Sequence, residues 1–192
     1  MTSLATVTVR PRIAGQITRI AFTEGQTVAE GDLLVEIDAR PYTLALAQAE
    51  AQLARDQAQL DSAKRDRERY RVLARQDSIA AQQRDQQEYT VLQLQGLVLS
   101  DQAAVGSAKL NLAYCRITAP VAGRVGLRQV DLGNYVQTSD ANGLVVITQI
   151  RPISVVFTVP EDTLPAILKR QRAGATLPVA AFDRSGNRVL AQ

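Results

Sequence analysis

The pattern of apolar and polar positions divides the chain into stretches of two kinds. Residues 7–38 alternate between apolar and polar side chains and break at Gly15 and Gly25, which is typical of short strands joined by tight turns. From Pro41 onward glycine disappears, and Ala, Gln, Leu, Arg and Asp dominate the sequence. This second composition predicts a long helix, with Asp38 placed to cap its N-terminus and Pro41 in its first turn.

Within the predicted helix, apolar residues recur at alternating intervals of four and three positions. These positions are Tyr42, Leu46, Ala49, Leu53, Leu60, Ala63 and Tyr70, with Asp56 and Arg67 as polar interruptions. The alternation returns farther along, at Tyr89, Leu92, Gly96, Leu99, Ala103, Gly106, Leu110 and Ala113. Two heptad helices of nearly equal length with a short link must fold back on each other. The sequence therefore predicts an antiparallel α-helical coiled-coil hairpin over residues 39–115, roughly 50 Å long at about 1.5 Å rise per residue.

The strand-like segments on either side of this hairpin resemble each other. Residues 13–17 are similar in sequence to residues 121–125. A short motif that begins at Gly25 is repeated at Gly133, and both repeats are separated by the same number of residues. Such an echo indicates an internal duplication that the hairpin interrupts. We therefore expect residues 7–38 and 116–150 to form one β-sandwich with a pseudo-twofold relation between its halves. Structural turns or close backbone contacts are expected at Gly15, Gly25, Gly123 and Gly133.

A different pattern begins after residue 150. It predicts a strand over residues 153–159, a short helix over 160–171, a strand over 176–182 and a turn at 183–186. With residues 1–6, the segment 151–192 is predicted to form a partial β-barrel domain, truncated because too few strands remain to close it. The fold class is therefore α+β, in an elongated chain of several modules. We expect the chain to be a piece of a longer protein.

The residue types present exclude several kinds of chemistry. The sequence contains no histidine, which rules out a Ser/His/Asp triad and imidazole metal ligands. Cys115 is the only cysteine, so we interpret it as a packing residue rather than part of a redox motif. The formal net charge of +3 combines 22 basic and 19 acidic residues, a mixture too even to indicate a nucleic-acid partner. We expect no enzyme activity, no cofactor and no metal site.

Three segments together resemble the membrane fusion proteins that serve resistance-nodulation-division (RND) efflux pumps. They are residues 9–15 at the start of the first half-motif, 116–123 at the start of the second, and 153–160 at the start of the barrel segment. The resemblance implies a lipoyl-like β-sandwich split by the hairpin. It also implies a periplasmic adaptor, held at the inner membrane by an N-terminal segment outside this chain. Such an adaptor links an inner-membrane RND-type transporter to an outer-membrane channel of the TolC type, and self-associates into a ring, for export of drugs and other small molecules.

In that family the hairpin tip meets the outer-membrane channel, and its motif falls here on Arg69, Leu73 and Ala80. The resemblance implies an orienting donor at Arg69 and an apolar anchor at Leu73. Ala80 departs from the family, which has Ser at this place. A Ser would cap the second helix, with Gln83 three residues later to complete a capping box. Ala80 has no capping oxygen, so either the cap is missing or Ser78 supplies it from two residues earlier.

Other interpretations are open at this point. An adaptor of an ABC-type or type I secretion exporter would share the same modules. A lipoyl or biotin carrier domain would need a modifiable lysine at the turn between the half-motifs, and residues 38–63 contain none. The basic residues within 64–75 are interleaved with Asp66 and Glu68, which is typical of a solvated helical face, although a docking surface on a channel is the alternative. Glu161 and Asp162 are interpreted as favourable charges at a helix N-terminus rather than as catalytic acids.

Overall fold

A computed structural model describes residues 2–3, 5–76, 80–154, 156, 158–174, 179–182 and 189–191. The chain divides into two compact units. One unit runs from Ser3 to Ile153 and contains a β-sandwich and a helical hairpin, and the other combines Met1–Thr2 with Ser154–Gln192. Each unit is described by itself.

The β-sandwich consists of short strands from both sides of the hairpin. The strands are β2 (Thr6–Val9), β3 (Gly15–Ile20), β4 (Thr27–Val28), β5 (Leu33–Ile37), β6 (Arg116–Thr118), β7 (Gly123–Val125), β8 (Tyr135–Val136) and β9 (Val145–Thr148). They form two antiparallel four-stranded sheets, with the orders β2-β9-β7-β4 and β6-β5-β3-β8. In the duplication, β2, β3, β4 and β5 of the first half correspond to β6, β7, β8 and β9 of the second. Exchanging each strand for its counterpart converts one sheet order into the other. The predicted sandwich with its pseudo-twofold relation is confirmed.

The sandwich core is apolar and closely packed. Strand alternation directs one set of side chains inward, and Leu34, Val35, Val145 and Ile147 have no exposed surface. A Cβ atom at Gly123 would lie 2.6 Å from the carbonyl oxygen of Thr148 in the neighbouring strand, so only glycine fits there. The sandwich thereby brings the two ends of the hairpin together on one rigid base.

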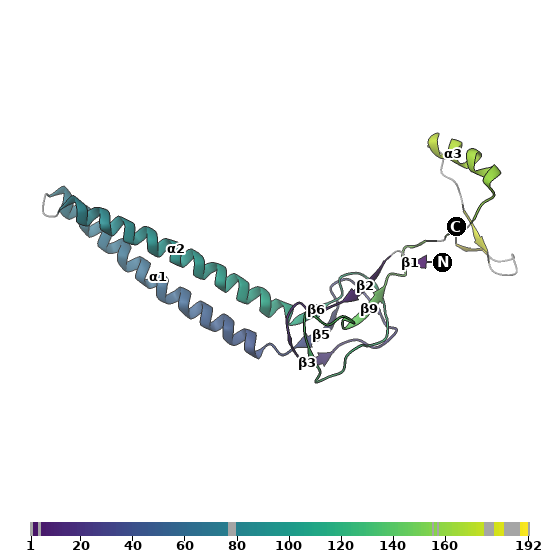
Figure 1. Ribbon diagram of the computed structural model, residues 1–192, viewed down its shortest axis with the longest axis horizontal. Coiled ribbons are helices and arrows are strands. Elements are labelled where there is room, and N and C mark those ends of the chain that lie inside the picture. Colours follow the sequence, from purple (N-terminus) through teal and green to yellow (C-terminus); the bar gives the residue numbers. More distant parts are fainter. Residues whose placement is uncertain are drawn as a thin grey trace. The chain divides into compact units, whose positions relative to one another are not determined.

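The hairpin consists of α1 (Arg40–Arg75) and α2 (Ala81–Tyr114), which lie side by side and lead away from the sandwich (Figure 1). The two helices contain 36 and 34 residues and lie within the predicted range 39–115. The N-cap of α1 is Ala39, one residue after the predicted Asp38. The Asp38 carboxylate nevertheless accepts a hydrogen bond from the Arg40 backbone N–H at 3.0 Å, so it stabilises the helix end from just outside the helix.

The predicted seam is correct on α1 and wrong on α2. Every predicted position on α1, including Asp56, is buried or half-buried. On α2 the predicted positions are exposed instead, and the buried apolar side chains are Val91, Val98 and Val105. Helix α2 therefore has two series of positions with heptad spacing. The series that faces α1 lies two residues after the predicted series. The buried stripe includes Asp101, which is polar like Asp56 of α1, whereas the predicted stripe offers Asp56 no polar partner.

The remaining elements are short. Strands β1 (Thr2–Ser3) and β10 (Ile153–Ser154), which contain the points where the chain passes from one unit to the other, form a two-stranded sheet. In the unit formed by the two ends of the chain, β11 (Ala181–Phe182) pairs antiparallel with β12 (Val189–Ala191). A 3₁₀ turn, Glu161–Thr163, leads into α3 (Leu164–Arg172), which confirms the predicted helix. The predicted turn at 183–186 lies outside the described residues. Among the residues described, none of the helices combines the length and the apolar character that crossing a membrane requires.

Candidate functional site: the hairpin tip

The tip is formed by the end of α1 and the beginning of α2. At the C-terminus of α1 the backbone N–H of Gln76 donates to the carbonyl of Leu73 at 3.2 Å. Ala80 has an extended conformation, φ −66° and ψ 142°, and α2 begins at the next residue. Residues 77–79, which include Ser78, lie outside the described residues. The first N–H groups and the last C=O groups of a helix lack the hydrogen-bond partners that groups farther inside the helix have. At the tip these groups and the neighbouring side chains lie outside the contact between α1 and α2.

The structure brings Arg69 and Leu73 together on one helix, a single turn apart. The Arg69 side chain is 71% exposed, and its contact is an ion pair with Asp66 on the same helix, with 3.3 Å between Nη1 and Oδ1. An exposed pair of this kind contributes little to stability. Leu73 is half-buried. Arg69 is thus available to a partner at little cost to the fold, and Leu73 retains part of its apolar surface in solvent.

Ala80 occupies the N-cap position of α2. Its side chain is exposed and makes no capping hydrogen bond. The backbone N–H of Gln83 donates to the Ala80 carbonyl at 3.0 Å, so the helix turn forms without the cap. A missing cap leaves backbone N–H groups of the first turn to solvent or to a partner.

Glu88 on α2 was missed by the sequence analysis and organises the basic stretch near the tip. Arg71 of α1 donates through Nη2 to both Glu88 carboxylate oxygens at 3.0 Å, and Arg67 Nη1 lies 3.8 Å from Oε1. This charge-assisted contact, in which one arginine nitrogen is shared by both carboxylate oxygens, ties the two helices together. Two arginines of this stretch therefore stabilise the hairpin itself, and Arg69 is left on the outer face.

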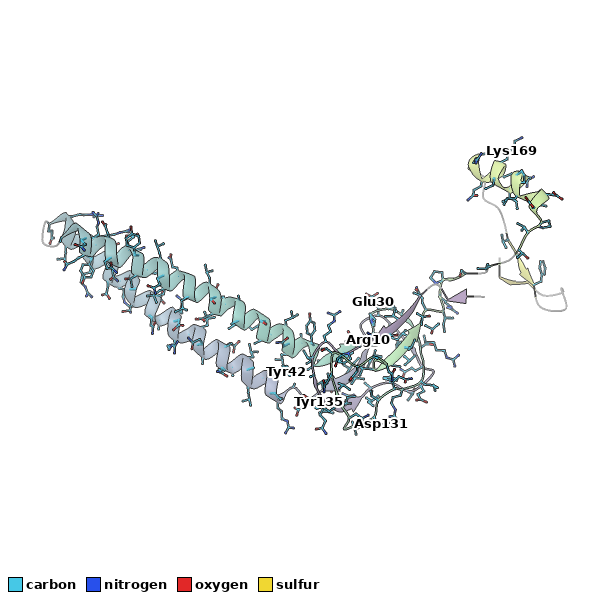
Figure 2. All side chains as sticks on the ribbon, in the orientation of Figure 1. Arg10, Glu30, Tyr42, Asp131, Tyr135 and Lys169 are labelled. Carbon is cyan, nitrogen blue, oxygen red and sulfur yellow. The ribbon has the colours of Figure 1, made fainter. Side chains whose placement is uncertain are left out.

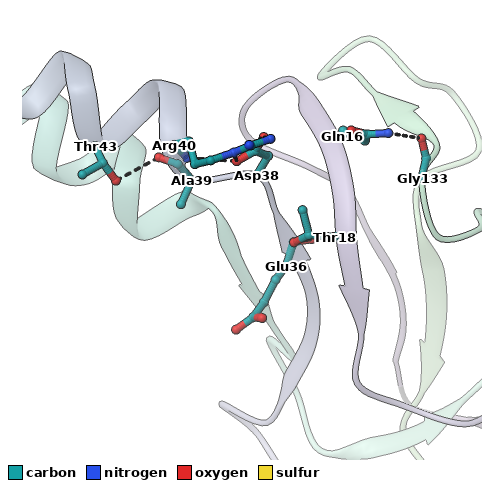
Figure 3. Close-up of polar contacts among 8 residues, drawn as sticks. All are labelled: Gln16, Thr18, Glu36, Asp38, Ala39, Arg40, Thr43 and Gly133. Carbon is teal, nitrogen blue, oxygen red and sulfur yellow. Dashed lines mark hydrogen bonds and ion pairs between the residues drawn. The ribbon is translucent and has the colours of Figure 1, made fainter.

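At the opposite end of the hairpin, polar contacts shape the turn that leads from β5 into α1 (Figure 3). Arg40 pairs with Asp38 through Nη2 and Oδ2 at 2.7 Å, and the hydrogen bonds from Arg40 lower the pKa of Asp38 to about 2. Thr43 Oγ1 donates to the Ala39 carbonyl at 2.9 Å. Tyr42, labelled in Figure 2 where the helices meet the sandwich, donates to the Ala14 carbonyl at 2.6 Å. The hairpin thus has a fixed base.

The described residues contain no group of three or more His, Cys, Asp or Glu side chains that could hold a metal ion. Cys115 is buried, and burial raises the pKa of its thiol. Its location in the core, together with a weak contact from Sγ to the Asn111 carbonyl at 3.7 Å, is consistent with a packing residue. The arrangement is suited to positioning a tip.

Comparison with known proteins relates this geometry to one family. Residues 5–148 match the barrel-sandwich hybrid domain of RND membrane fusion proteins. The multidrug resistance protein MdtA of Yersinia enterocolitica is 52% identical over 191 residues, which cover 97% of this chain and 43% of that protein. MdtA of Yersinia pestis is 51% identical with the same coverage. The chain therefore spans less than half the length of these relatives.

Solved structures share the arrangement of sandwich and hairpin. A MacA-MexA chimera that contains the α-hairpin domain of Pseudomonas aeruginosa MexA gives a TM-score of 0.53 at 31% identity, covering 77% of this chain and 49% of the chimera. The membrane fusion protein Spr0693 from Streptococcus pneumoniae R6 gives a TM-score of 0.62 at 18% identity, covering 77% of this chain and 63% of that protein. The second likeness shows the fold alone.

Proposed function

We propose that this chain, which belongs to the family of RND membrane fusion proteins, is the sandwich and hairpin part of a periplasmic efflux adaptor. In this role the protein links an inner-membrane RND transporter to a TolC-type outer-membrane channel for export of drugs and other small molecules. The observation that carries the proposal is a duplicated sandwich interrupted by a long hairpin, in a chain half identical to multidrug resistance proteins. The function is mechanical coupling, and the family is one of adaptors rather than enzymes.

We propose that the tip contacts the channel through Arg69 and Leu73. The support is the exposure of Arg69, the half-buried state of Leu73 and the uncapped start of α2 after Ala80. Leu73 acts as an apolar anchor and Arg69 as an orienting donor, as in small interfaces where a few side chains dominate binding. Neither residue takes part in the Arg71–Glu88 contact between the helices, so both can bind a partner while α1 and α2 stay in contact.

We also propose that the protein associates with copies of itself into a ring through the outer face of α2. Its exposed heptad stripe contains Tyr89, Leu92, Leu99 and Leu110, which are 67%, 57%, 65% and 51% exposed. The intervening positions of the stripe are Gly96, Ala103, Gly106 and Ala113. Apolar residues at heptad spacing with small residues between them suit close packing against a neighbouring helix. A second hairpin offers such a surface.

Drug susceptibility of cells carrying Leu73→Asp tests the tip. We expect the full-length variant to be present at normal level by immunoblot and to lose resistance, because a charge replaces the anchor while the seam is untouched. Leu44→Asp, at a residue 72% exposed on the same helix close to the sandwich, is the matched control and should retain resistance. Normal resistance with Leu73→Asp at normal expression would remove the tip from the mechanism.

A pull-down with the tagged full-length protein tests the partners. Recovery of an RND transporter together with an outer-membrane channel is the expected result. Recovery of an ABC-type transporter would instead show an adaptor for a different class of exporter.

A further inference from the structure

Two carboxyl groups meet across the middle of the hairpin seam. Asp56 lies on the buried face of α1, is 1% exposed and precedes Leu60 on that face. Asp101 occupies the buried face of α2 between Val98 and Val105. The pairs Glu50–Lys109 and Arg71–Glu88 set a register between the helices that places Asp101 opposite Asp56. A polar pair at this position interrupts an otherwise apolar seam, where burial of unpaired charge is costly.

Hydrogen-bond donors are distributed unevenly around the pair. Asp56 accepts from Gln52 Nε2 at 2.7 Å and from Arg55 Nε at 2.9 Å. Asp101 Oδ2 is buried and accepts no hydrogen bond from any residue in the described part of the chain. Two ionised carboxylates cannot donate to each other, so a favourable contact between the facing carboxyl groups needs a proton on one of them. Because the donors surround Asp56, the proton resides on Asp101.

The charges near the pair balance when one proton is bound. Arg55 and the two carboxyl groups are the charged groups that act on either carboxyl. With Asp101 protonated, the Arg55 charge offsets that of Asp56. With both carboxyls ionised, an extra negative charge remains in a partly desolvated seam. Farther along the hairpin, the charges are paired between the helices as Glu50 with Lys109 at 3.6 Å, and in the cluster around Glu88.

We propose that Asp56 and Asp101 share one proton across the seam, and that loss of this proton loosens the pairing of α1 with α2 at the middle of the hairpin. A carboxyl pair that holds a single proton is a recognised consequence of placing two like charges side by side. Because the tip lies at the far end of the same two helices, the protonation state changes how firmly the tip is held. The inference goes beyond the adaptor function and does not depend on the identity of the partners.

The direction of the pH effect follows from the two carboxyls. Burial and the neighbouring Asp56 raise the pKa of Asp101 above its ordinary value of 3.8. The stability that its proton confers is therefore complete below 3.8 and is lost as the pH rises through the raised pKa. The hydrogen bond from Arg55 lowers the pKa of Asp56, so the contribution of that carboxylate is present above 3.8 and is lost only in stronger acid. The seam is most stable while Asp101 is protonated and Asp56 is ionised.

Thermal unfolding of the 192-residue chain, followed by circular dichroism at 222 nm from about pH 4 to about pH 8, tests the proposal. Asp101→Asn keeps a donor toward Asp56 and cannot ionise. We expect this variant to melt at a higher temperature than the wild type at the alkaline end and to converge with it at the acidic end. As a control, Asp61→Asn removes an exposed carboxylate from α1, the helix that carries Asp56, and its melting temperature should follow the wild-type change with pH.

Carboxyl ¹³C chemical shifts of the wild-type chain give a second readout, which does not depend on the folding of Asp101→Asn. An Asp101 titration midpoint above 3.8, which moves down in Asp56→Asn, would support the shared proton. A midpoint at or below 3.8 would overturn it, and so would an Asp101→Asn melting profile parallel to that of the wild type at every pH.

Discussion

The β-sandwich and the hairpin belong to one unit of the chain but are stabilised in different ways. Sixteen buried residues form the described sandwich core, whereas the described hairpin has one cluster of four, namely Leu60, Ala63, Val91 and Val98, with Val105 buried farther along α2. The remaining contacts between α1 and α2 include the Arg71–Glu88 pair and the pair of carboxyls. A thin seam supplemented by charged contacts is easier to deform than an apolar core. The sandwich therefore acts as the fixed base, and the hairpin is the part that conditions or partners can alter.

Equivalent leucine truncations in the two regions should separate them most clearly. Leu34→Ala in the sandwich should cost about 4 kcal/mol, because a closely packed core cannot collapse into the cavity. Leu60→Ala in the hairpin should cost about 2 kcal/mol, because the two helices can approach each other and fill part of the cavity. The cost of creating a cavity by Leu→Ala depends on how far the surrounding structure can collapse. Urea unfolding with hydrogen exchange at strand and helix amides measures both losses. Equal costs would contradict the proposed difference between base and hairpin.

Adjacent residues on α2 test which of its faces meets α1. Val91 is 1% exposed and Leu92 is 57% exposed. Val91→Asp should destabilise the hairpin by on the order of 3 kcal/mol, because it places an unpaired charge in the seam. Leu92→Asp should change the stability of the isolated chain by less than about 0.5 kcal/mol. Urea unfolding at 222 nm distinguishes them, and a larger loss for Leu92→Asp would favour the seam predicted from the sequence.

The N-cap of α2 offers a smaller effect in the opposite direction. Ala80→Ser should stabilise the hairpin by about 1 kcal/mol, because its hydroxyl can accept a hydrogen bond from a first-turn N–H group. Ala80→Val adds volume without an oxygen and serves as the control. Thermal unfolding at 222 nm checks both. No gain from Ser relative to Val would mean that the first turn of α2 is already capped by another group.

The smallest expected effect concerns the base of the hairpin. Arg40 holds the pKa of Asp38 at about 2, below the ordinary 3.8, so ionised Asp38 stabilises the fold above that ordinary value. This contribution is lost as the pH falls through about 2. The difference in melting temperature between the wild type and Asp38→Asn should therefore shrink from about pH 4 to about pH 2. A difference that stays constant over this range would show that the carboxylate does not contribute through its charge.

The sequence by itself determined the architecture of the larger unit. The echo of residues 13–17 at 121–125 predicted a sandwich of two related halves, because each half repeats its strand and turn pattern locally. Heptad spacing predicted both helices and the seam of α1, in which the polar positions of Asp56 and Arg67 interrupt an apolar series. These features depend on local conformation and periodicity.

Tertiary structure alone decided which stripe of α2 faces α1 and which charges meet between the helices. Both stripes have heptad spacing and apolar residues, so periodicity cannot choose between them. The choice follows from the partner helix, because Asp56 must be matched by a polar position such as Asp101, and Arg71 by Glu88. Such matches join residues distant in sequence, and their free energy depends on the desolvation of both partners at once.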